Sequence, residues 1–274
     1  MTTRHDDPRN EGPFDIRAFT RTAQGSFRAE LDLTSFADAP LDTATLDLVR
    51  YLERLEAATM EHLRNLLVTA THKDARVTAF LVTWAFEKFW IADALDSVLE
   101  AHGLPRTREI PEGAPRKSAD EAIQRSGPIR RAVAAVGLGA PIVAIHMTAG
   151  LIDEWILRAA YDRLRETTSS EALRAAILRI QSVKTRHEAF FADETDWRLR
   201  DSPRAVRQVK TALRTAAWPI GGVERAAVDR DLFERFTFGG VDGVARAEEI
   251  GRRIAGLPGL DDRVAQATVR KLLP

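Results

Sequence analysis

Apolar residues recur at spacings of three and four along most of this chain, which is the spacing of one face of an α-helix. Runs that alternate apolar and polar residues, as strands do, are nearly absent. The pattern therefore predicts an all-α protein. The long helices are expected at about residues 42–69, 73–101, 142–165, 170–198 and 203–217.

The segments outside these helices divide the chain into three parts. Residues 1–40 carry prolines and mixed charges and predict an N-terminal arm. Residues 41–200 hold four of the long helices, with a crossover connection over about 103–120 that is rich in proline, glycine and charge and is followed by a short helix at "SADEAIQRS". Residues 201–274, with the glycine-rich turn "TFGGVDG", predict a C-terminal helical extension packed on the other helices.

The amino-acid composition argues against several classes of function. The chain has 274 residues, 45% of them hydrophobic, which is enough for a core of ordinary size. Lysine plus arginine equals aspartate plus glutamate at 40 each, so there is no basic excess for a nucleic-acid partner. No run of about 18 apolar residues predicts a membrane span. Cysteine is absent and the N-terminal residues are polar, so we expect a cytoplasmic protein whose metal ligands, if any, are Asp, Glu and His.

Two predicted helical hairpins agree in the position of polar residues. Thr71 and Thr168 each precede an acidic residue by three positions, a signature of a helix start. Glu87 lies sixteen residues after Thr71, and Lys184 lies sixteen residues after Thr168. Each is followed three residues later by a ring side chain. The two helices thus place a charged residue and a ring at the same height.

The partner helices supply a glutamate at nearly the same height. Glu56 lies fifteen residues before Thr71, and Glu154 lies fourteen residues before Thr168. Antiparallel residues equidistant from a tight turn lie side by side. We therefore expect Glu56 to face Glu87, and Glu154 to face Lys184.

Large apolar residues flank these charges, which predicts that they point inward. Glu87 lies within "TWAFEKFW", and Tyr161 follows Glu154 by two helical turns and is expected in the same cavity. Buried carboxylates without partners cost several kcal/mol each, so a cation must join them. The neighbouring Lys88 is expected on the exposed side, and the aromatic residues Trp84, Phe86, Phe89 and Trp90 are expected in the core.

This layout resembles the ferritin-like superfamily, in which two helices supply one Glu each and two supply Glu-x-x-His, together holding two iron or manganese ions. The resemblance covers about residues 42–198. It implies an up-down four-helix bundle with a long crossover connection. It also implies Glu56 and Glu154 as single carboxylates, Glu87 as a bridging carboxylate and His187 as a terminal metal ligand.

Two positions depart from the family pattern. Trp90 stands where the first motif has its histidine, and Lys184 stands where the second has its bridging glutamate. Three interpretations follow. In the first, one Fe or Mn ion remains on Glu87, Glu154 and His187, which implies an oxidase or oxygenase that acts on a small molecule.

The second and third interpretations centre on the lysine. In the second, the Lys184 ammonium takes the place of a lost metal beside Glu56, Glu87 and Glu154, which leaves a metal-free binding or scaffold protein. In the third, Lys184 is a reactive amine, with Tyr161 beside it as a second catalytic group. Bundles of this family often pair through helix faces, so the resemblance also implies a homodimer.

The sequence leaves several alternatives open at these positions. Glu53, one turn before Glu56, competes for the same place on its helix. A face shifted by one residue would replace Glu154 by Asp153, which then aligns with His146. His62 and His72 fall near a helix surface or a turn and receive no role.

Overall fold

The computed structural model of the chain describes residues 14–104, 141–222 and 227–274. Within these ranges the chain is helical and contains no strand, which confirms the predicted all-α class. The helices are α1 (Ile16–Arg21), α2 (Ser35–Asp38), α3 (Thr43–Ala57), α4 (Thr59–Leu67), α5 (Ala75–Ala101), α7 (Pro141–Thr167), α8 (Glu171–Arg200), α9 (Pro203–Thr215), α10 (Ala227–Phe238), α11 (Gly240–Ala255) and α12 (Asp262–Leu272), with 3-10 helices η2 (Arg28–Glu30) and η3 (Ala70–Lys73). Across the same ranges, every helix is too short or too polar to cross a membrane.

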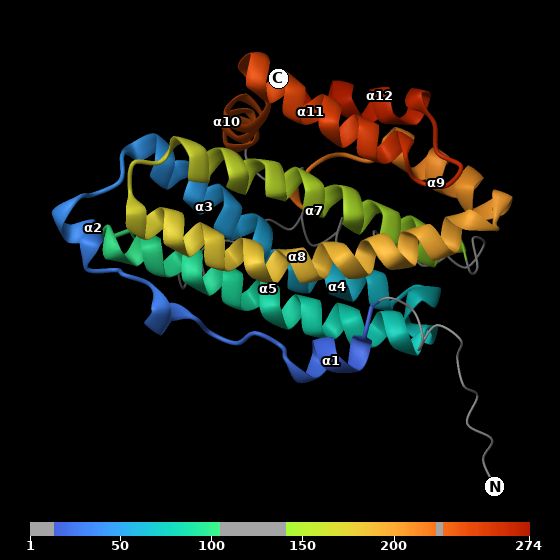
Figure 1. Cartoon of the computed structure of the whole chain (residues 1–274), viewed down its shortest axis with the longest axis horizontal. Coiled ribbons are helices and arrows are strands. Elements are labelled where there is room, and N and C mark those ends of the chain that lie inside the picture. The colour runs from blue at the N-terminus through green and yellow to red at the C-terminus, as the bar shows by residue number, and fades with distance from the viewer. Residues whose placement is uncertain (1–13, 105–140, 223–226) are drawn as a thin grey trace, which may run out of the picture.

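Two helix pairs form the centre of the molecule. Helix α3 packs on α5 and α7 packs on α8, and contacts between α5 and α8 join the two pairs (Figure 1). The predicted crossover between the pairs and the short helix at "SADEAIQRS" lie outside the described residues. The paired arrangement brings one long face of each of four helices into a common interior.

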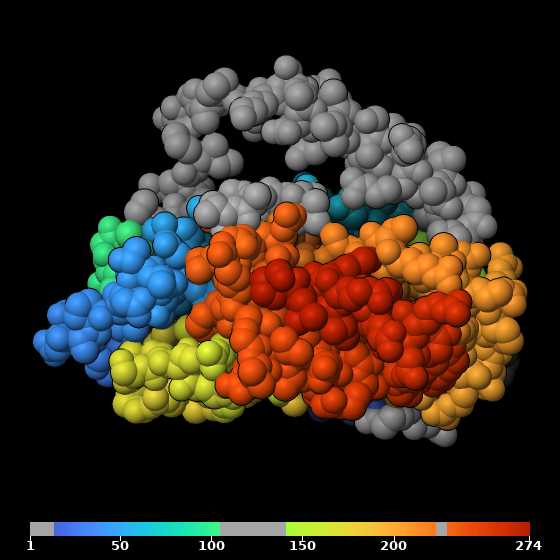
Figure 2. Space-filling model, turned by 90° about the horizontal axis from the view of Figure 1, so that it is seen from above, coloured from blue at the N-terminus to red at the C-terminus, as the bar shows by residue number. Residues whose placement is uncertain are grey.

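The two ends of the chain cover this centre. The described part of the predicted arm, residues 14–40, places α1 and α2 against α5 (Figure 1). Helix α10 packs on α3 and α7, α11 packs on α7, and α12 packs on α11 and α9. Viewed from above, these C-terminal helices form much of the visible surface (Figure 2).

Helix boundaries differ from the sequence prediction at both predicted caps. Helix α5 begins after Asp74, whose side chain accepts a hydrogen bond from the Val77 amide at 3.1 Å. Helix α8 begins after Ser170, which accepts from the Leu173 amide at 3.2 Å. Thr71 and Thr168 are therefore not the caps. A short polar side chain on an extended backbone stands closer to each helix and satisfies its first amides instead.

The predicted helix over residues 42–69 is interrupted once. Helix α3 ends at Ala57 and α4 begins at Thr59, with Ala58 between them. The Ala58 amide still donates to the Arg54 carbonyl at 3.1 Å, and the His62 amide donates to the Ala58 carbonyl at 3.1 Å. The two helices therefore follow one another closely, and a small residue marks the break.

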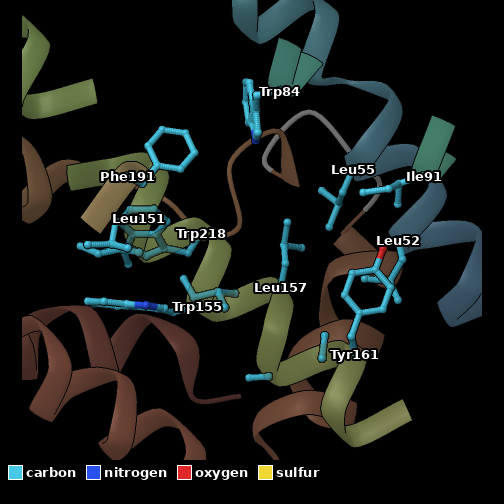
Figure 3. Packing of buried hydrophobic residues seen from close by; sticks show 14 of the residues in the cluster. Leu52, Leu55, Trp84, Ile91, Leu151, Trp155, Leu157, Tyr161, Phe191 and Trp218 are labelled. Carbon is cyan, nitrogen blue, oxygen red and sulfur yellow. The ribbon is translucent and has the colours of Figure 1, made fainter. Parts of the chain in front are cut away.

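Aromatic packing in the interior is dense, and Figure 3 shows part of it. The rings of Phe80 and Phe190 stack with centroids 3.8 Å apart. Trp84 is 5% exposed, as predicted for a core residue, and Trp90 is partly buried. Phe86 and Phe89 are 45% and 38% exposed, so the prediction that they belong to the core is wrong. The face of α5 that carries them points away from the partner helices.

Candidate functional site

Two glutamates and two lysines alternate in the interior, one from each long helix; we call Glu56 (α3), Lys88 (α5), Glu154 (α7) and Lys184 (α8) the charged layer. The Lys184 ammonium donates to Glu56 Oε1 at 3.1 Å and lies 2.7 Å from Glu154 Oε2. The Lys88 ammonium lies 2.7 Å from Glu56 Oε2 and 3.8 Å from Glu154 Oε1. Each carboxylate therefore faces both ammonium groups.

The charged layer is almost completely removed from solvent, since none of its side chains is more than 3% exposed. Burial alone would raise the pKa of Glu56 and Glu154, but Lys184 and Lys88 outweigh burial and hold both pKa values below the usual range. Burial likewise opposes the charged form of Lys88, yet Glu56 and Glu154 raise its pKa above the usual value. All three groups are stabilised in their charged forms.

Two further side chains donate hydrogen bonds to the carboxylates. The Tyr161 hydroxyl donates to Glu56 Oε1 at 3.0 Å, and the Trp84 indole donates to Glu154 Oε1 at 3.1 Å. Burial and the nearby Glu56 raise the pKa of Tyr161 well above its usual value, so the phenol keeps its proton and acts as a donor. Tyr161 lies in the same interior space as Glu154, as predicted. Its hydroxyl there holds the Glu56 carboxylate in place.

A second polar group extends the charged layer along the bundle. His187 Nε2 lies 2.7 Å from Glu87 Oε2, and His187 Nδ1 lies 3.9 Å from Glu154 Oε1. The other oxygen of Glu87 accepts from the Gln24 amide at 2.8 Å and lies 3.2 Å from the Arg186 guanidinium. Glu87 is therefore held by the α8 helix and the N-terminal arm.

The sequence-predicted site residues do converge, with one change of partners. Glu154 faces Lys184, as the turn-height argument predicted. The expected partner of Glu56 was Glu87, but the contacts of Glu56 go to the two lysines and Tyr161. Like-charged carboxylates separate where cations are within reach, which explains the exchange of partners.

Lys88 is the residue that sequence reasoning placed wrongly. It was expected on the exposed side of α5, but its side chain is 3% exposed and pairs with Glu56. Adjacent residues on a helix point about 100° apart, so Glu87 and Lys88 are both buried only when the helix is covered on more than one side. Helix α5 contacts α3, α4, α8 and α1, which covers it in this way.

The structure decides between the alternatives that the sequence left open. Glu53 is fully buried, like Glu56, but the contacts to both lysines are made by Glu56. Asp153 is 7% exposed and lies beside the charged layer rather than replacing Glu154. His146 does not pair with Asp153, because its Nδ1 lies 2.8 Å from the Thr71 hydroxyl.

The donor set of these residues does not fit an iron or manganese ion. Such an ion needs several Asp, Glu or His donors aimed at one point. Instead, ammonium groups approach both carboxylates of the charged layer, and His187 Nε2 is directed at Glu87. Across the described ranges, no three His, Asp or Glu side chains are placed to hold a metal ion together.

A pocket of about 180 Å³ adjoins Lys88. Its walls come from α3, α4, α5, α7 and the turn that follows α9, and three of the lining residues, Trp84, Leu55 and Leu157, are labelled in Figure 3. The lining residues are Leu55, Ala58, Thr59, Glu61, His62, Asn65, Trp84, Lys88, Asp153, Leu157, Ile220 and Gly221.

Two titratable residues of the pocket were not predicted as part of the site, since His62 received no role and Asp153 was considered only as a replacement for Glu154. Burial raises the pKa of Asp153 to about 7, although Lys88 and the Ile220 amide oppose that shift. Burial, with Lys88 nearby, lowers the pKa of His62 to about 4. His62 lies one helical turn after Ala58, and this spacing was a signal that both residues share an inward face. The pocket itself could not be predicted, because the turn that closes it is distant in sequence.

Comparison with protein-family models, with curated proteins and with solved structures found no match to this chain.

Proposed function

We propose that this chain is a ferritin-like bundle without metal, in which the ammonium groups of Lys184 and Lys88 take the place of ions, and that it serves as a small-molecule binding protein. One observation carries the proposal: two buried carboxylates each face two buried ammonium groups at the place where the family pattern has its metal ligands.

Electrostatics supports this proposal over the oxidase. A divalent ion placed among these groups would lie within a few ångströms of two fixed positive charges, and its attraction to Glu56 and Glu154 is already shared with them. Breaking a buried ion pair costs about 3–5 kcal/mol because a charge loses its partner. Metal binding would require that cost at both lysines.

The contacts of Lys184 also argue against a nucleophilic role. A reactive amine must present a free lone pair. The Lys184 nitrogen instead donates to Glu56 Oε1 and lies 2.7 Å from Glu154 Oε2, so both carboxylates already contact it. The pocket beside Lys88 favours binding over a purely structural scaffold, because a scaffold needs no cavity next to its buried charges.

The proposal is tested by measuring metal in protein purified with iron and manganese supplied. Four proteins are compared by elemental analysis: the wild type, Lys184→Glu, Lys88→Glu and Lys73→Glu. Lys73 is exposed, so its variant makes the same charge change outside the interior. We expect no stoichiometric metal in the wild type or in Lys73→Glu, and metal in at least one of the two interior variants, which gain a carboxylate and lose an ammonium.

The outcomes separate the competing functions. Stoichiometric metal in the wild type would overturn the proposal and favour the oxidase, whose activity would then appear as absorbance changes on adding ferrous ion and oxygen. Metal in none of the proteins would contradict the idea that a lysine stands in for an ion. The homodimer stays a prediction, and light scattering of the purified chain measures it directly.

A further inference from the structure

The pocket beside the charged layer contains a buried carboxylate that forms no ion pair within the part of the chain that the structure describes. Asp153 is 7% exposed, and its Oδ1 accepts a hydrogen bond from the Ile220 amide at 2.7 Å. Among the described residues no lysine, arginine or histidine forms an ion pair with it. A buried carboxylate is ordinarily paired with a cation.

Within the described residues, the two ammonium groups of the charged layer are already paired with its own two carboxylates. Glu56, Glu154 and Asp153 supply three carboxylates, and Lys88 and Lys184 supply two ammonium groups. Both lysines lie closest to Glu56 or Glu154, at 2.7 Å. A ligand that carries one positive charge would therefore balance the group, whereas an anion would add to the imbalance.

The other walls of the pocket define the rest of the ligand. Leu55, Leu157 and the Trp84 ring give an apolar side, and Asn65 and His62 give polar groups able to accept N–H donors. The cavity is about 180 Å³. An apolar cavity of about 150 Å³ is known to hold benzene, so roughly six to eight non-hydrogen atoms fit.

We propose that this pocket binds a compact primary amine, whose ammonium group pairs with Asp153 and whose apolar part lies against Leu55, Leu157 and Trp84. The inference rests on the proposed function, in that ammonium groups rather than a metal neutralise Glu56 and Glu154. The ammonium donates to the free oxygen of Asp153 and to Asn65 or His62. Glu61, partly buried on α4, lies at the rim and adds a second acidic group on the way in.

Three ligands of similar size and different charge test the proposal: benzylamine, benzyl alcohol and benzoate. Isothermal titration calorimetry of the wild type at pH 8 is expected to give the lowest Kd for benzylamine. Asp153→Asn keeps the acceptor for the Ile220 amide and removes the charge. It should raise the Kd of benzylamine by about tenfold or more, which is the usual effect of losing a charge-assisted hydrogen bond, and leave the Kd of benzyl alcohol nearly unchanged.

Two further variants serve as controls. Glu61→Gln removes a carboxylate at the rim and should weaken benzylamine much less than Asp153→Asn does. Ala58→Phe fills the cavity from the break between α3 and α4 and should abolish binding of all three compounds. Circular dichroism and urea unfolding of each variant establish that it is folded.

Several results would overturn the amine site: benzoate or benzyl alcohol binding the wild type more tightly than benzylamine, equal benzylamine affinity in Asp153→Asn, or no binding at millimolar concentration. The charge series in the wild type decides the matter even if a variant fails to fold. Metal analysis of the same preparation separates the two ideas. A metal-free protein that does not prefer benzylamine refutes this inference alone, and a metal-containing protein refutes the proposed function.

Discussion

At the scale of single residues, the charged layer is a closed set in which no member is stabilised alone. Taking a carboxylate or an ammonium out of water costs several kcal/mol, and the attraction between partners offsets this only with good geometry. Here the hydroxyl of Tyr161 and the indole of Trp84 each add a hydrogen bond to one of the two carboxylates. Removal of any one member of the charged layer should therefore destabilise the protein, because it leaves a buried partner unpaired.

Asp153 gives a residue-scale prediction for the dependence of stability on pH. Its pKa is about 7 in the folded protein, against an ordinary value of 3.8. Between these values the unfolded chain loses a proton that the folded chain keeps, so stability falls as the pH rises from about 4 to 7. Relative to Asp153→Asn, which cannot ionise, the wild type should lose up to about 4 kcal/mol of unfolding free energy over this window.

Urea unfolding of both proteins at pH 4, 5.5, 7 and 8 measures this difference. The comparison cancels the contributions of His62 and His146, whose pKa values are also shifted, because both proteins contain them. A constant difference between wild type and variant across the four pH values would show that Asp153 titrates as it does in water.

Counting from a turn predicted one pair of site residues correctly and one incorrectly, since Glu56 does not contact Glu87. Glu154 and Lys184 are on consecutive helices, and counting outward from the turn between them was enough to pair them. Lys88 could not be placed by counting, because its burial depends on α3, α4 and α8 surrounding α5 at once. The same aromatic neighbours that marked Glu87 as buried also flank Lys88, and they were the available signal.

At the scale of elements, the contact between α7 and α8 depends on a glycine. A Cβ atom on Gly150 would clash with the buried ring of Phe191. Gly150→Ala should therefore destabilise the protein by about 1–3 kcal/mol through overpacking, even though alanine favours a helix by about 1 kcal/mol. Thermal or urea unfolding measures the change.

A second substitution tests the cause of that loss. Phe191→Leu makes room at the ring, so the double variant Gly150→Ala, Phe191→Leu should be more stable than the sum of the single effects predicts. Strict additivity of the two free-energy changes would mean that the helices do not meet at this point as closely as described.

Element type was predictable and element ends were less so. The three- and four-residue spacing located the long helices, because each buries a continuous apolar face. The caps were displaced because Asp74 and Ser170 stand nearer the helices than Thr71 and Thr168 do. A single break at Ala58 carries no sequence signal, since alanine is a good helix former.

At the scale of the whole molecule, the C-terminal extension takes part in the pocket. The turn after α9 supplies Ile220 and Gly221 to its wall, and the Ile220 amide donates to Asp153 at 2.7 Å. Helix α10 packs on both α3 and α7. Sequence patterns placed the extension on the bundle but did not reveal this contact, because 67 residues separate the two partners.

These contacts predict that the chain unfolds as one unit. Differential scanning calorimetry should show one transition with a calorimetric enthalpy close to the van't Hoff enthalpy, because the extension and the long helices share buried surface. Two resolved transitions, or a calorimetric enthalpy well above the van't Hoff value, would mean that residues 201–274 melt independently.

The alternation of charge across four helices has a consequence for how the chain selects its alignment. Apolar faces tolerate sliding, because one leucine contact is much like another. One helical turn is about 5.4 Å, so a helix displaced by a turn would carry its lysine or glutamate away from both partners at once. A misaligned packing therefore leaves an unpaired charge in the interior. The free-energy cost of that charge disfavours every alignment except the correct one.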